Sequence, residues 1–132
     1  EYTQALESID ALAADYQKAV DAKFQEVENL YNSYMQQRAS LSESARQQVE
    51  NNILQKEAEA TEYQESLFGT DGELMTKRLS LIQPIQDRVF KAIENFSKLY
   101  GYDLVIDIAA NPTVLYYSSK VDYTQQIINS LK

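Results

Sequence analysis

The first 68 residues contain neither Pro nor Gly, and this uninterrupted stretch constrains the fold more than any other feature. Apolar residues recur along it in steps of mainly four and three. They are Tyr2, Leu6, Ile9, Ala13, Tyr16 and Val20, followed by Val27, Leu30, Tyr34 and Leu41. This spacing is typical of a coiled-coil helix. A helix over residues 2–39 would be about 57 Å long, which is too long to be buried inside a globule of 132 residues.

The segment from Arg38 to Glu43 offers a place for the chain to reverse. Ser40, with Glu43 three residues later, has the spacing of a capping box, which starts a new helix. A second amphipathic stretch follows, and its outer face is rich in Glu. We predict an antiparallel helical hairpin over residues 2–68, with its tip near residues 38–43. One unbroken helix is the alternative, because neither Ser nor Leu forbids a helix.

Glycine and proline divide the rest of the helical pattern. Gly69 and Gly72 form the one strong break, and we predict a hinge there. Helical spacing resumes from Leu74 to Tyr100. Pro84 falls inside this stretch and predicts a kink or a helix start at that point. Gly101 is expected to end the helix.

The period of the apolar pattern changes after Gly101. Residues 102–108 have the period of a strand, with Leu104, Ile106 and Ile108 on one face, and residues 113–117 form a second apolar run beyond a turn. We predict two β-strands and a short C-terminal helix. Two strands alone make a marginal sheet, so we expect either other copies of the chain or a strand before Glu1 to complete it, and both alternatives indicate an oligomer. The residues that we assign to oligomerisation are Leu104, Ile106, Ile108, Leu115 and Tyr117.

The predicted fold class is therefore mostly α, with a long antiparallel helical hairpin and a small β body that forms oligomers. Residues 1–83 are assigned to the hairpin arm, with its tip near residues 38–43 and its break at residues 69–72. Residues 84–132 are assigned to the oligomerisation body. No apolar run approaches the ~20 residues of a membrane span.

The composition argues against several classes of function. The chain has no Cys and no His, so it lacks thiol chemistry, the commonest general base and the commonest zinc ligand. Its three Gly residues do not form a nucleotide-binding loop. The net charge of -8 argues against nucleic acid as a partner. We therefore predict no enzymatic activity, no cofactor and no metal site, and we interpret the row Glu57, Glu59, Glu62 and Glu65 as a solvated helix face.

Several segments together resemble the Skp/OmpH family. They are the tip Leu41-Ser42-Glu43-Ser44-Ala45-Arg46, the helical segment Pro84-Ile85-Gln86-Asp87-Arg88-Val89, the strand from Gly101 to Asp107, and the strand from Val114 to Tyr117 before a short helix. The resemblance covers nearly the whole chain, and residues 84–132 are its more specific part. The break from Phe68 to Glu73 is similar to the variant in Bacteroidetes-type members.

The resemblance implies a periplasmic, ATP-independent holdase chaperone. Members of the family are homotrimers with a small β body, from which three helical hairpins project around a cavity that holds unfolded outer-membrane proteins. The implied partners are these unfolded proteins, and the implied place of action is the cell envelope. The sequence departs from the family in two ways. The chain opens directly on a helix where members carry a first β-strand, and its charge is -8 where the best-known members are basic.

The arm also carries a set of aromatic and Met residues that has two interpretations. The set is Phe24, Tyr31, Tyr34, Met35 and Tyr63. These side chains could fill the interface between the two helices. They could also contact unfolded clients, because a two-helix arm cannot bury all its apolar groups and Tyr and Met are adaptable contact residues. A structural coiled-coil adaptor or spacer of the cell envelope is the alternative to the holdase function.

Overall fold

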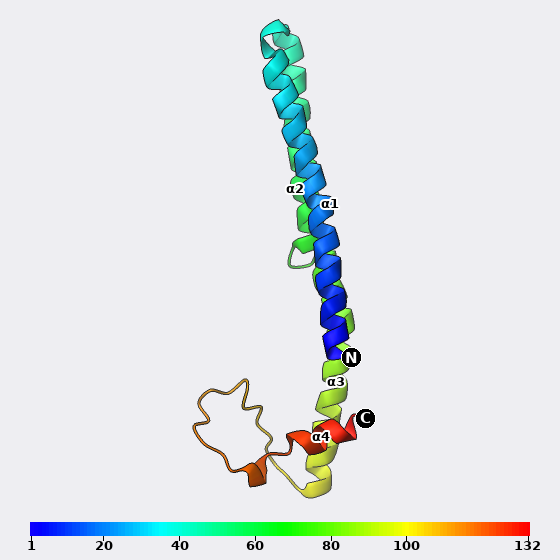
Figure 1. The fold of residues 1–132 in the computed structure, drawn as a ribbon, viewed down its shortest axis with the longest axis vertical. Helices are drawn as coiled ribbons and strands as arrows, with labels where there is room; N and C mark the ends of the chain where they lie inside the picture. Colours follow the sequence, from blue (N-terminus) through cyan, green and yellow to red (C-terminus); the bar gives the residue numbers. More distant parts are fainter. The chain divides into compact units, whose positions relative to one another are not determined.

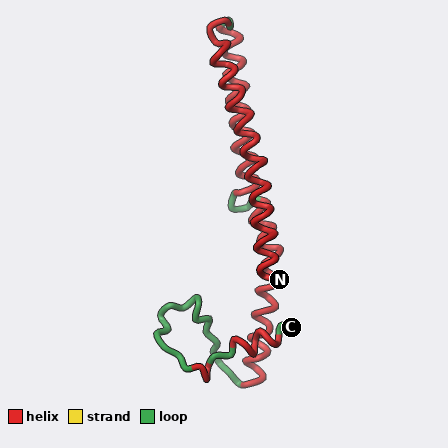
Figure 2. Tube along the Cα trace, viewed as in Figure 1, coloured by secondary structure: helices red, strands yellow, loops and turns green.

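The computed structural model describes residues 1–132 and is mainly helical (Figures 1 and 2). In chain order the elements are α1 (Tyr2–Gln37), η1 (Arg38–Ser40), α2 (Glu43–Phe68), α3 (Glu73–Tyr100), η2 (Ser119–Val121) and α4 (Thr124–Ser130). The chain divides into two compact units, residues 1–81 and 82–132. We call them the N-terminal unit and the C-terminal unit.

Helices α1 and α2 lie side by side and run in opposite directions, as Figure 1 shows. The predicted helical hairpin is confirmed, and the alternative of one unbroken helix is wrong. The buried residues of these two helices are Ala5, Ile9, Val20 and Tyr34 on α1 and Ile53, Ala60 and Leu67 on α2. The three on α2 are seven residues apart, which is the heptad spacing of a coiled coil. Val20 is the one large side chain that is fully buried, so the hairpin has a thin core.

The hairpin tip is capped by a different serine from the one that the sequence predicted. Ser42 has an extended backbone, and its side chain accepts a hydrogen bond of 3.2 Å from the Ala45 N–H. Ser40 still belongs to the 3-10 turn η1, and its hydroxyl donates to the Gln37 carbonyl at 2.8 Å. An N-cap residue needs a non-helical backbone, and for that reason the cap moves two residues along the chain.

The break between α2 and α3 is a tight turn that requires both of its glycines. The Gly72 N–H donates to the Gly69 carbonyl at 2.9 Å. A Cβ atom on Gly69 would lie 2.5 Å from the carbonyl oxygen of Glu65, and one on Gly72 would lie 2.9 Å from that of Leu67. Close approach of the backbone therefore excludes any side chain at these two positions.

Tyr16 of α1 contacts residues on both sides of this turn. Its ring meets Phe68 edge to face, with the centroids 6.3 Å apart. Its hydroxyl donates to Glu73 Oε2 at 2.9 Å, which is the main reason that the pKa of Tyr16 lies above 10.0. One tyrosine thus links the end of α2 and the start of α3 to α1.

Helix α3 passes through Pro84 without interruption, so a helix start at that position is wrong. The predicted stop at Gly101 is confirmed. Gly101 has a φ of 74°, and the Tyr102 N–H donates to the Ser97 carbonyl at 2.9 Å. This bond between the second residue after the helix and its last turn is that of a Schellman motif, which favours glycine at the left-handed position.

The two predicted β-strands do not form in this chain, and residues 102–118 are loop and turns (Figure 2). Short-range hydrogen bonds form here instead of hydrogen bonds between strands. The Asn111 side chain donates to the Asp107 carbonyl at 2.7 Å, and the Asp107 carboxylate accepts from the Ala109 N–H at 3.0 Å. Such side-chain bonds compete with strand pairing. A small β body is therefore not present in the single chain. The predicted C-terminal helix is present as α4.

Candidate functional site

An apolar stripe runs along the half of α1 that is nearer the hairpin tip. Phe24, Tyr31 and Met35 are separated by seven and four residues, so helical geometry puts them on one face. Tyr31 is 51% exposed and Met35 is 48% exposed, while Phe24 is half-buried. We call these three residues the arm stripe. Because the thin hairpin leaves them open to solvent, they offer an adaptable apolar contact surface.

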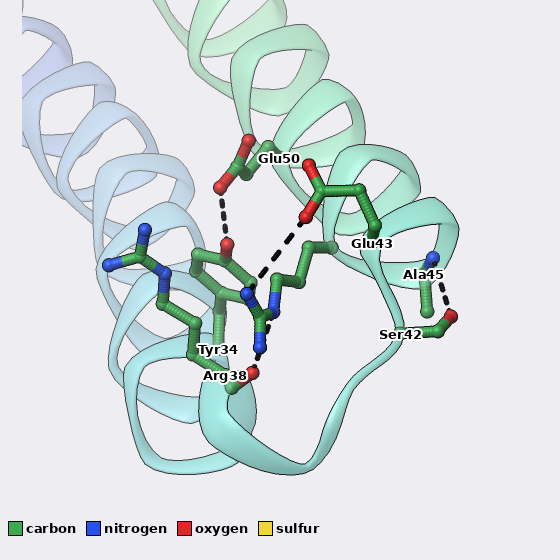
Figure 3. A network of polar contacts seen from close by, with 7 residues as sticks. Tyr34, Arg38, Ser42, Glu43, Ala45 and Glu50 are labelled. Carbon is green, nitrogen blue, oxygen red and sulfur yellow. Dashed lines mark hydrogen bonds and ion pairs between the residues drawn. The ribbon is translucent and has the colours of Figure 1, made fainter.

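The other two residues of the predicted client-binding set are placed differently. Tyr34 is only 6% exposed, and its hydroxyl donates to the Glu50 carboxylate of α2 (Figure 3). This hydrogen bond, more than desolvation, raises the pKa of Tyr34 above 10.0. Tyr63 is half-buried, with Lys23 Nζ 4.8 Å from the centre of its ring. Tyr34 thus joins the two helices near the tip, and the five residues do not form one patch.

A polar network holds the chain reversal at the tip (Figure 3). Arg46 Nε donates to the Arg38 carbonyl at 2.9 Å, and the same guanidinium lies 4.0 Å from the Glu43 carboxylate. Sequence reasoning missed the first contact, because a bond from a side chain to a backbone oxygen eight residues away leaves no pattern in the sequence. Together with the Tyr34–Glu50 bond, this network connects α1, η1 and α2.

The residues assigned to oligomerisation lie in an apolar loop that the single chain does not cover. Leu115 is 95% exposed, and Leu104, Ile106 and Tyr117 are also exposed, whereas Ile108 is half-buried. No residue of the C-terminal unit is buried. Folded chains rarely leave this many large apolar side chains of one segment in water, which makes this loop a candidate contact surface.

An aromatic cluster joins the end of α3 to the start of α4, and sequence reasoning did not identify it. The Phe96 ring lies 6.0 Å from that of Tyr102 and 5.4 Å from that of Tyr123. The Tyr102 hydroxyl donates to the Tyr123 hydroxyl at 2.6 Å, which is the main reason that the pKa of Tyr102 is raised. The sequence signal that could have revealed this cluster is Gly101. A glycine that ends a helix in a Schellman motif turns the following residue, here Tyr102, back onto the helix.

Two further features of residues 1–132 bear on the kind of site. No three acidic side chains come close enough to hold a metal ion together. None of the helices combines the length and the apolar character that crossing a membrane requires. The surfaces that the chain offers are thus the arm stripe, the apolar loop and the polar flanks of the hairpin.

Comparison with known proteins identifies a family. The model of the family described as "Outer membrane protein (OmpH-like)" matches residues 1–131. No curated protein matches the chain. The match extends over both units, including the hairpin tip, the glycine turn and the apolar loop. The chain belongs to the OmpH-like family.

Proposed function

We propose that this protein is an ATP-independent holdase chaperone of the periplasm that binds unfolded outer-membrane proteins and prevents their aggregation. The family match over residues 1–131 is the observation that carries this proposal. The exposed arm stripe supports it, since a surface of Tyr, Phe and Met suits many unfolded sequences without selecting one. In this proposal no residue is catalytic and no cofactor is needed.

We further propose that the working form is a homotrimer, with residues 84–132 as its body and residues 1–83 as its arms. The absence of any buried residue in the C-terminal unit supports this, because partner chains would cover the loop around Leu104, Ile106 and Leu115. Three arms would then surround one client. Many weak contacts add up in such an arrangement, because each bound segment raises the local concentration of the next.

Arm movement is a further part of the proposal. The turn at Gly69–Gly72 interrupts the helical hydrogen bonds between α2 and α3, so bending there breaks no helical hydrogen bond, although the Tyr16 contacts to Phe68 and Glu73 would have to open. Amide hydrogen exchange tests this directly. Exchange is expected to be faster at residues 69–72 than in the hydrogen-bonded turns on either side, and equal protection across the turn would contradict a hinge.

An aggregation assay tests the holdase function. Two unrelated outer-membrane proteins are diluted from urea with one trimer equivalent per client and no nucleotide, and light scattering is followed. A holdase suppresses the scattering of both clients. A structural adaptor or spacer, which binds one folded partner, would leave both to aggregate, and that result would refute the proposal.

A further inference from the structure

An open groove of about 890 Å³ lies beside the glycine turn. Its walls include Leu54, Ala58, Glu57, Glu62, Glu65 and Asp71. Helix α2 buries Ile53, Ala60 and Leu67 in the hairpin, so these groove residues lie on its other side. Figure 1 shows the loop of the turn standing out from α2 on the side away from α1. The groove is therefore separate from the arm stripe on α1.

Leu54 and Ala58 supply the apolar side chains of the groove, and we call these two residues its floor. Leu54 is 62% exposed there, and Ala58 lies one turn further along α2. Three hydroxyl side chains line the groove, and two of them, Thr61 and Ser66, donate hydrogen bonds to their own helix. Thr61 donates to the Glu57 carbonyl at 3.0 Å, and Ser66 donates to the Tyr63 carbonyl at 2.7 Å. The floor thus offers carbon surface to an occupant and little hydrogen bonding.

The charged side chains that line the groove are all carboxylates, and we call them its rim. Glu57, Glu62, Glu65 and Asp71 all line it, and no Lys or Arg does. Of the nearby cations, Lys56 is bound to Glu59 at 3.4 Å and Lys23 lies over the Tyr63 ring. Residues 41–72, which include the groove, carry seven acidic and two basic residues, a net charge of -5. An occupant with the opposite charge would meet uncompensated carboxylates.

We propose that this groove binds unfolded segments in which aliphatic residues are flanked by Lys or Arg. The ammonium or guanidinium groups would pair with the glutamates of the rim, while their alkyl stems and the aliphatic side chains cover Leu54 and Ala58. This inference rests on the proposed holdase function and names the part of a client that the acidic arm selects. In this proposal, binding of such a segment requires both its charge complementarity with the glutamates and its contact with Leu54 and Ala58.

Peptide binding to the full chain tests the inference. Two labelled twelve-residue peptides are compared by fluorescence anisotropy at low salt, one built of Lys and Leu and one with Glu in place of Lys. The groove variant combines Glu57→Gln, Glu62→Gln and Glu65→Gln. The matched control combines Glu7→Gln, Glu26→Gln and Glu28→Gln on α1, which changes the net charge equally at exposed positions outside the groove. A third variant, Leu54→Ser, removes the apolar floor.

The chain is expected to prefer the Lys peptide. The groove variant should bind it about tenfold more weakly, since exposed ion pairs are individually weak and three are lost. Leu54→Ser should also weaken binding, and the control should stay within about twofold of the parent. Equal loss in the groove variant and the control would show that net charge alone acts, and unchanged binding in either groove variant would also overturn the inference.

Two further readouts separate this inference from its alternatives. Folded lysozyme, a basic protein, should not compete with the Lys peptide; effective competition would make the groove a site for folded basic proteins and overturn the inference. Aggregation protection is measured on the same variants. A groove that binds the Lys peptide in a protein that protects no client would refute the holdase function alone, whereas full protection with no peptide binding would refute the groove alone.

Discussion

Replacing Tyr31 and Met35 together by Ser should weaken client binding about tenfold. Each side chain is about half exposed, so the pair offers ~190 Å² of apolar surface on the usual side-chain areas. If a client covers half of it, burial contributes roughly 2.4 kcal/mol at ~25 cal/mol per Å². Ordering the two side chains costs about 1 kcal/mol of this. The remaining ~1.4 kcal/mol corresponds to about a factor of ten in affinity.

The assay is the suppression of light scattering by an unfolded outer-membrane protein, titrated with parent and variant. Tyr34 is left unchanged because it holds the hairpin together through Glu50. The matched control replaces Asn32 and Gln36 by Ser, which have the same spacing on α1 and are exposed but polar. The control should protect like the parent. If the Tyr31/Met35 variant also protects like the parent, the arm stripe does not bind clients.

Three further substitutions test the hairpin itself. Val20→Ala should lower the free energy of unfolding by about 2 kcal/mol, because it removes two buried carbons and leaves a cavity, whereas Leu54→Ala at an exposed position should cost under about 0.5 kcal/mol in urea unfolding. Gly69→Ala should cost about 1–3 kcal/mol in the same assay, since its Cβ meets a backbone oxygen; an unchanged midpoint would contradict the close approach. Tyr34 has a pKa raised above 10.0, so its neutral hydroxyl stabilises the hairpin below pH 10 and that contribution is lost as the pH rises through the raised pKa. Between pH 9 and 11 the melting temperature of the parent should therefore fall more than that of Tyr34→Phe, and parallel curves would contradict the role of this bond.

The hairpin was predictable from the sequence because local rules determine it. The absence of Pro and Gly before Gly69 and the apolar steps of mainly four and three from Ile9 to Tyr34 are both visible along the chain. The stop at Gly101 follows from the same kind of rule, since only a residue without a Cβ adopts its φ at little cost. Where two local signals competed, as at Ser40 and Ser42, the backbone conformation of the tip decided between them.

The β-strands were not predictable with the same certainty, because a strand depends on a partner outside its own segment. The spacing of Leu104, Ile106 and Ile108 indicates which face of a strand could be buried. It does not identify a second strand with which this segment could form hydrogen bonds. In the single chain Asp107 and Asn111 bond to nearby backbone groups and turn the segment into a loop.

The candidate contact surface was predictable only in part, for the same reason. Residue type alone made Tyr31, Tyr34 and Met35 equal candidates for client binding. In the structure Tyr31 and Met35 are exposed, whereas Tyr34 is buried. The position of each side chain relative to α2 decides whether it fills the hairpin or faces solvent, and Tyr34 is drawn inward by Glu50. The cluster of Phe96, Tyr102 and Tyr123 depends on chain folding beyond Gly101, which no periodic pattern encodes.

Native mass spectrometry of the protein mixed with one unfolded outer-membrane protein tests the proposed trimeric holdase most directly. Three chains of 15.1 kDa have a mass of 45.3 kDa. The expected result is a complex whose mass is 45.3 kDa plus that of a single client, formed without nucleotide. A client bound to one 15.1 kDa chain, or a trimer that never carries a client, would contradict the proposal.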